Sequence, residues 1–211
     1  MGFGLLFIGY FITYLGAFVP QISTFTYILG AGVILFSLRK LIYENKLFIV
    51  SASVALLLEI SSIISLGIQI FSGNDANLVA TILLYVAHAS AFALNILLML
   101  SIMLLAKEVE LKHLVRMTLV NTAFVAIGAV LFIPCEIVTD KDVLFGLSVA
   151  LTAVKIIYSV FSLVIIFNSY MRICYEGDEK MQKSTTGVPI LDSLNKLTDK
   201  IFSKKGKGGK K

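Results

Sequence analysis

Long apolar runs separated by short polar joins are the dominant pattern along the chain. A run of about 18 or more apolar residues is long enough to cross the hydrocarbon core of a bilayer as a helix. Backbone groups in lipid are satisfied only in helices or closed barrels, and barrel strands would be short and of alternating polarity. The pattern therefore predicts an all-α fold, a bundle of six transmembrane helices at about 2–19, 23–43, 46–72, 76–106, 113–134 and 142–171.

Basic residues are concentrated in alternate joins between these runs. The second join holds Arg39, Lys40 and Lys46, and the fourth holds Lys107, Lys112 and Arg116. The first and third joins contain no basic residue, and the fifth is mainly acidic. Because cytoplasmic joins carry an excess of Lys and Arg, the second and fourth joins and the C-terminal tail are predicted to be cytoplasmic. We therefore expect a multi-pass protein of the cell membrane with both termini in the cytoplasm.

The composition favours a membrane protein and divides the chain into two parts. Hydrophobic residues make up 58% of the 211 residues and charged residues only 15%, whereas soluble domains carry about 25% charged residues. The net charge of +5 comes entirely from residues 172–211, which hold ten Lys and Arg against five Asp and Glu. The pattern predicts a transmembrane domain over 1–175 and a basic cytoplasmic tail over 176–211.

The tail combines an amphipathic segment with a lysine-rich end. Apolar residues recur at helical spacing over about 188–203, which predicts a short cytoplasmic helix. The basic end contains Lys204, Lys205, Lys207, Lys210 and Lys211. Such a tail is expected to bind anionic lipid head groups on the inner leaflet. Alternatively, the helix packs on the protein's own cytoplasmic joins and is followed by a solvated end. Nucleic acid is the weaker interpretation, because no folded reader domain surrounds the lysines.

Two opposite charges are predicted near the middle of the membrane. Glu59 lies about 17 Å along the third run from its inner end, and Lys155 about 20 Å along the sixth run from its outer end. An intramembrane charge costs about 2.5–3.5 kcal/mol on insertion scales and is a functional hypothesis by default. His88 in the fourth run is also near mid-depth. These three residues are predicted to form a central polar cluster.

Further polar side chains extend this predicted cluster toward the cytoplasmic side. Asn95 follows His88 by seven residues and therefore lies on the same helical face as His88. Ser159 and Ser162 follow Lys155 by four and seven residues and lie on the same face as Lys155. Asn121 lies in the inner half of the fifth run. One interpretation is a pathway for an ion, proton or solute. The other is a structural role, in which the charges and amides fix the register of neighbouring helices.

No recognised motif for catalysis or metal binding is present. The sequence contains no metalloprotease, nucleophile-elbow or phosphate-loop pattern, and its two histidines and two cysteines are far apart. We therefore predict no catalytic residues, no metal and no cofactor, and an enzyme is the weaker option. Gly9 and Gly30, with other glycines of the first two runs, are expected to allow close approach of helices.

The opening segment 1–11, MGFGLLFIGYF, and the join 38–41, LRKL, resemble uncharacterised multispanning membrane proteins of clostridial bacteria. The resemblance covers the first fifth of the chain and implies a bacterial plasma membrane, with no activity and no functional residues to carry over. The six-span plan is also similar to the substrate-binding subunits of vitamin transporters, in architecture alone.

Two functional hypotheses follow from these patterns. The first is a small transport or permeation component that uses the region of Glu59, His88 and Lys155. The second is a structural or accessory subunit that docks an unidentified protein partner, or the inner leaflet, through its basic tail.

Overall fold

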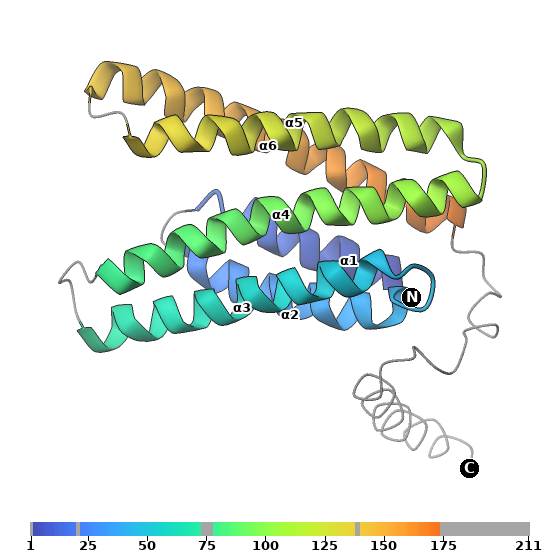
Figure 1. Ribbon diagram of the computed structural model, residues 1–211, viewed down its shortest axis with the longest axis horizontal. Helices are drawn as coiled ribbons and strands as arrows, with labels where there is room; N and C mark the ends of the chain where they lie inside the picture. Colours follow the sequence, from blue (N-terminus) through green and yellow to red (C-terminus); the bar gives the residue numbers. More distant parts are fainter. Residues whose placement is uncertain (1, 20–21, 73–77, 138–139, 174–211) are drawn as a thin grey trace, which may run out of the picture. The chain divides into compact units, whose positions relative to one another are not determined.

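The computed structural model describes residues 2–19, 22–72, 78–137 and 140–173, and this part of the chain is helical without strands. The element order is α1 (Gly2–Tyr10), η1 (Phe11–Leu15), α2 (Ser23–Leu41), α3 (Leu47–Ser72), α4 (Leu78–Glu108), α5 (Lys112–Ile137) and α6 (Lys141–Ile173) (Figure 1). The predicted all-helical fold is confirmed. The tail helix predicted over 188–203 and the lysine-rich end lie outside the described residues.

Five of the helices, α2 to α6, are long and apolar enough to cross a membrane. The first apolar run forms a shorter helix, because α1 and the π-helical turn η1 together end at Leu15. Turn hydrogen bonds follow, with Phe18 N–H donating to Leu15 O at 3.2 Å and Val19 N–H to Gly16 O at 3.2 Å. A helical conformation is disfavoured at Val19, the residue before Pro20, so the helix does not continue to the end of the apolar run. A sixth crossing therefore stays a prediction.

The helices pack in chain order, and α6 returns to contact α1. Each of α2 to α5 lies against the helix before it and the helix after it, and α4 also contacts α6. In Figure 1, α4 runs between α3 on one side and the α5–α6 pair on the other. Its buried residues include Leu94, Leu98, Met99 and Ile102, which are fully enclosed. The core of the bundle thus lies along α4.

Large apolar side chains cover the outside of the described bundle. Phe71 is 91% exposed, Leu78 73% and Phe145 71%. Soluble monomers rarely expose large contiguous apolar surface. Together with the length of α2 to α6, this surface is consistent with a lipid environment.

Glycines allow α1 and α2 to approach closely, as the sequence predicts. A Cβ atom on Gly30 would overlap Oγ1 of Thr13 and lie 2.7 Å from Thr13 N. A Cβ on Gly9 would lie 2.8 Å from Ile34 N. Because these obstacles are backbone atoms, the first two helices are in contact along their main chains. This contact fixes the wall of the cavity described below.

Candidate solute site

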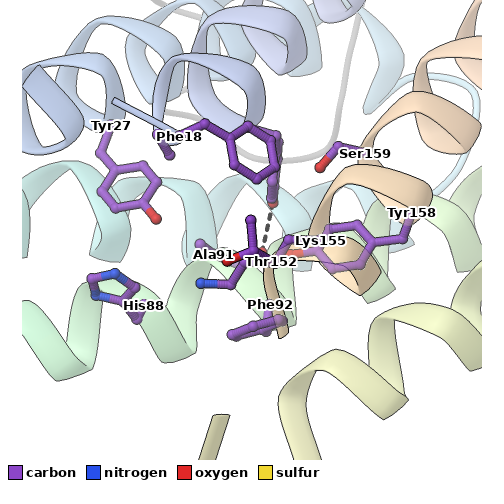
Figure 2. Close-up of a pocket in the computed structure, with 11 residues that line it drawn as sticks. Phe18, Tyr27, His88, Ala91, Phe92, Thr152, Lys155, Tyr158 and Ser159 are labelled. Atoms are coloured by element: carbon purple, nitrogen blue, oxygen red, sulfur yellow. Dashed lines mark hydrogen bonds between the residues drawn. The ribbon is translucent and has the colours of Figure 1, made fainter. Parts of the chain in front are cut away.

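A cavity of about 220 Å³ lies among η1, the turn after it, α2, α4 and α6. Figure 2 shows its side chains converging from these separate elements. Its lining consists of Tyr14, Ala17, Phe18, Tyr27, His88, Ala91, Phe92, Thr152, Lys155, Tyr158 and Ser159. The lining therefore mixes aromatic rings with a cation and several hydroxyl groups.

Lys155 provides the charged group of the cavity. Its Nζ lies 5.7 Å from the ring centroid of Phe92 and 5.7 Å from that of Phe132. The faces of aromatic rings carry partial negative charge and attract a cation at this distance. In Figure 2 the side chain extends from α6 toward α4 and ends between His88 and Phe92. The two phenylalanines thus hold the ammonium group at one wall of the cavity.

His88 is fixed by a hydrogen bond and two ring contacts. Its Nδ1 lies 2.8 Å from Leu84 O, and because a carbonyl oxygen only accepts, Nδ1–H is the donor in this contact. The ring stacks on Phe132 at 5.6 Å with an interplanar angle of 12°, and Tyr27 meets it edge-on at 5.7 Å. Phe132 therefore contacts both His88 and Lys155, and brings these two polar residues to the same side of the cavity.

Hydroxyl groups complete the polar part of the lining. Tyr14 donates a hydrogen bond of 2.6 Å to Ala91 O, which ties η1 to α4. Within the described ranges, the hydroxyls of Tyr27, Tyr158 and Ser159 form no hydrogen bond with another residue. Figure 2 shows these three side chains directed toward the cavity. They remain available as hydrogen-bond donors to a bound molecule.

A second polar group lies in the bundle interior and joins α1, α4, α5 and α6. Asn95 Nδ2 donates to Tyr10 OH at 2.7 Å, Asn121 Nδ2 donates to Ser162 Oγ at 2.6 Å, and Ser162 Oγ donates to Asn95 Oδ1 at 3.3 Å. All four residues are completely buried. Of this network, Asn121 Oδ1 has no hydrogen-bond partner. Most of its polar atoms satisfy one another, which favours a structural role for the network.

The structure brings some of the predicted cluster together and separates one member. His88, Lys155 and Ser159 line the cavity, and Asn95, Asn121 and Ser162 form the buried network. Glu59 does not line this cavity. It is half-buried on α3, where its Oε1 lies 3.4 Å from the position of a Cβ built on Gly32 of α2. The Glu59 carboxylate therefore belongs to the α2–α3 contact.

This separation predicts independent effects of the two mid-membrane charges. We expect Glu59→Gln and Lys155→Met to change the thermal midpoint of the detergent-solubilised protein additively, because α3 packs on α2 and α4 whereas α6 packs on α1, α4 and α5. The measurement is a double-mutant cycle. A double variant that recovers much of the loss caused by each single change would contradict this expectation.

Aromatic residues of the site were not anticipated from the sequence. Tyr10 and Tyr14 stack at 4.1 Å and connect the buried network to the cavity wall, and Phe92 and Tyr158 line the cavity together. The available signal was the position of these tyrosines inside apolar runs, away from the ends where an interfacial ring is favoured. A buried tyrosine hydroxyl usually needs a polar partner.

The fold and the cavity define an all-helical protein with five helices suited to crossing a membrane and a polar site in the bundle. Comparison with protein-family models, curated proteins and solved structures finds no match to this chain. Among the residues that the structure describes, no group of three or more His, Cys, Asp or Glu side chains is arranged to hold a metal ion.

Proposed function

We propose that this chain is a multi-pass protein of the cell membrane that acts as a small transport or permeation component, with the cavity as its solute site. In this proposal the chain crosses the membrane six times and both termini are cytoplasmic. The observation that carries the proposal is a lysine in a cavity inside an apolar bundle, with Tyr27, Tyr158 and Ser159 in the same lining, whose hydroxyls bond to no other described residue. Polar groups kept at such a cost favour a functional role.

The cavity and the buried network differ in whether their polar groups are available to a ligand. The network of Asn95, Asn121 and Ser162 is closed and makes its hydrogen bonds internally. The cavity has space, a cation and available donors. Under the proposed topology, the turn near Ala17 lies on the outer side, and solute enters there. The alternative role as an accessory subunit rests on the tail, which lies outside the described residues.

Thiol accessibility tests whether the cavity is open to water in a membrane. In a background with Cys135 and Cys174 replaced by serine, we expect Ala17→Cys to react with a membrane-impermeant methanethiosulfonate reagent added outside intact cells. Val160→Cys is the matched control, because Val160 is 49% exposed on α6 and does not line the cavity. A thiol in lipid lacks the water needed to form the reactive thiolate. Equal labelling of both positions, or none at Ala17→Cys, would contradict an open solute site.

Transport itself is tested in proteoliposomes. We expect protein-dependent uptake of at least one radiolabelled probe from the panel benzoate, benzamide and benzylamine, measured against protein-free vesicles. Ala17→Trp should remove most of this uptake by filling the entrance, while Val160→Trp should retain it. Absence of protein-dependent uptake for the whole panel, from protein that runs as a single species on size-exclusion chromatography, would argue against the transport role.

A further inference from the structure

The described residues of the cavity lining carry positive charge without a compensating carboxylate. Among the eleven described residues that line it, none is Asp or Glu, and Lys155 is the side chain that is cationic by default. The nearest predicted counter-charge, Glu59, lies at the α2–α3 contact instead. In surroundings of low dielectric constant a cation interacts far more strongly with an opposite charge than it does in water. The lining therefore favours an anionic ligand.

The available volume limits the ligand to a small molecule. The cavity measures about 220 Å³, which is below the range of about 300–1,000 Å³ typical of drug-sized ligands. An apolar cavity of about 150 Å³ is sufficient to bind benzene. The space thus accommodates one six-membered ring together with a carboxylate group. A single lysine also favours one negative charge over the two carried by a phosphate ester.

The lining combines polar groups from α6 with aromatic surface from η1 and the turn after it. Lys155, Tyr158 and Ser159 approach from α6, and the hydroxyls of the last two bond to no other residue in the described ranges. A carboxylate accepts several hydrogen bonds through its two oxygens. The side chains of Tyr14 and Phe18 supply aromatic surface to the cavity. Aromatic rings contact a flat apolar body by stacking or through their edges.

We infer that the cavity binds a small organic monoanion with a flat apolar body, a carboxylate about the size of benzoate. The carboxylate pairs with the Lys155 ammonium and accepts hydrogen bonds from Tyr158 and Ser159, and the body of the ligand lies against the aromatic wall. This inference rests on the proposed function, since it names the class of solute for the same cavity.

The test is equilibrium binding of three probes of similar shape and different charge to the purified full chain in mild detergent. Titration calorimetry is run with sodium benzoate, benzamide and benzylamine. We expect benzoate to bind about tenfold or more tightly than benzamide, because hydrogen bonds to a charged group are stronger than neutral ones. Benzylamine should bind more weakly still. Equal or tighter binding of benzamide or benzylamine would overturn the anionic class.

Substitutions test whether the preference for benzoate over benzamide arises in the cavity. Lys155→Met should abolish the preference for benzoate over benzamide, and Lys155→Arg should keep it. Lys107→Met is the control, because Lys107 is an exposed lysine in the last turn of α4, outside the cavity. Should Lys155→Met fail to give a single species, Tyr158→Phe removes one hydroxyl alone and should weaken benzoate binding more than benzamide binding. Unchanged benzoate binding in a folded Lys155→Met or Tyr158→Phe protein would overturn the inference.

Failure of this inference is distinguishable from failure of the proposed function. If benzamide or benzylamine binds better and protects Ala17→Cys from labelling, the ligand class is wrong and the solute site stands. If benzoate binds with the expected preference but no probe enters proteoliposomes, the ligand class stands and the transport role is wrong.

Discussion

Gly30→Ala is expected to lower the thermal midpoint of the solubilised protein substantially, while Gly67→Ala leaves it unchanged or raises it. The Gly30 Cβ would overlap Thr13 Oγ1 and lie 2.7 Å from Thr13 N and 2.9 Å from Thr13 Cα. Apart from its own helix backbone and chain neighbours, no atom of the described residues lies within 4 Å of a Cβ on Gly67. Both substitutions gain about 1 kcal/mol of helix propensity. Overpacking typically costs about 1–3 kcal/mol, so only Gly30→Ala should show a net loss.

Backbone atoms of Thr13 stand in the way of a Cβ on Gly30, and this gives a second expectation. Thr13→Ala removes the Oγ1 atom but leaves the backbone nitrogen and Cα in place. We therefore expect Thr13→Ala to restore little of the stability lost in Gly30→Ala. The measurement is the thermal midpoint by size-exclusion chromatography after heating, for both single variants and the double variant. Full recovery in the double variant would show that the side chain alone, and not main-chain contact, limits the approach of η1 and α2.

Asn95→Ala is expected to destabilise the bundle more than Asn121→Ala, although both residues are completely buried. Asn95 exchanges hydrogen bonds with Tyr10 and Ser162, at 2.7 and 3.3 Å. Asn121 makes one bond, to Ser162, and its Oδ1 is already unsatisfied. The truncation removes the same atoms in both cases. Leaving a buried polar group without a partner costs about 1–3 kcal/mol; Asn95→Ala removes a hydrogen bond from both Tyr10 and Ser162, whereas Asn121→Ala removes one from Ser162 alone.

A double-mutant cycle isolates the Asn95–Tyr10 contact. Tyr10→Phe removes the hydroxyl that accepts the 2.7 Å hydrogen bond. Interhelical hydrogen bonds in membrane proteins contribute about 0.6 kcal/mol on average and up to about 1.7 kcal/mol. We expect a coupling within this range from reversible unfolding in a mixture of mild detergent and sodium dodecyl sulfate. A coupling of zero, or an equal loss of stability in Asn95→Ala and Asn121→Ala, would contradict the assigned network.

The helical elements follow from local sequence, and the structure reproduces them. The apolar run predicted over 46–72 is α3, Leu47–Ser72, and the run predicted over 142–171 is α6, Lys141–Ile173. Long apolar runs permit few alternatives, because each backbone group must find its partner within the helix. The exception is the first run, where the helix ends at Leu15 even though the apolar composition continues to Val19.

The sequence by itself determined the helical class and the position of each polar residue along its run, and it predicted that glycines of the first two runs allow close approach of helices. Only the tertiary structure decided which polar residues meet. Glu59 and Lys155 have similar predicted depths, yet Glu59 lies at the α2–α3 contact while Lys155 lies in the cavity beside His88. Counting residues at about 1.5 Å each gives position along a helix axis. The direction in which a side chain points across the bundle depends on how each helix is rotated against its neighbours, and packing alone sets that rotation.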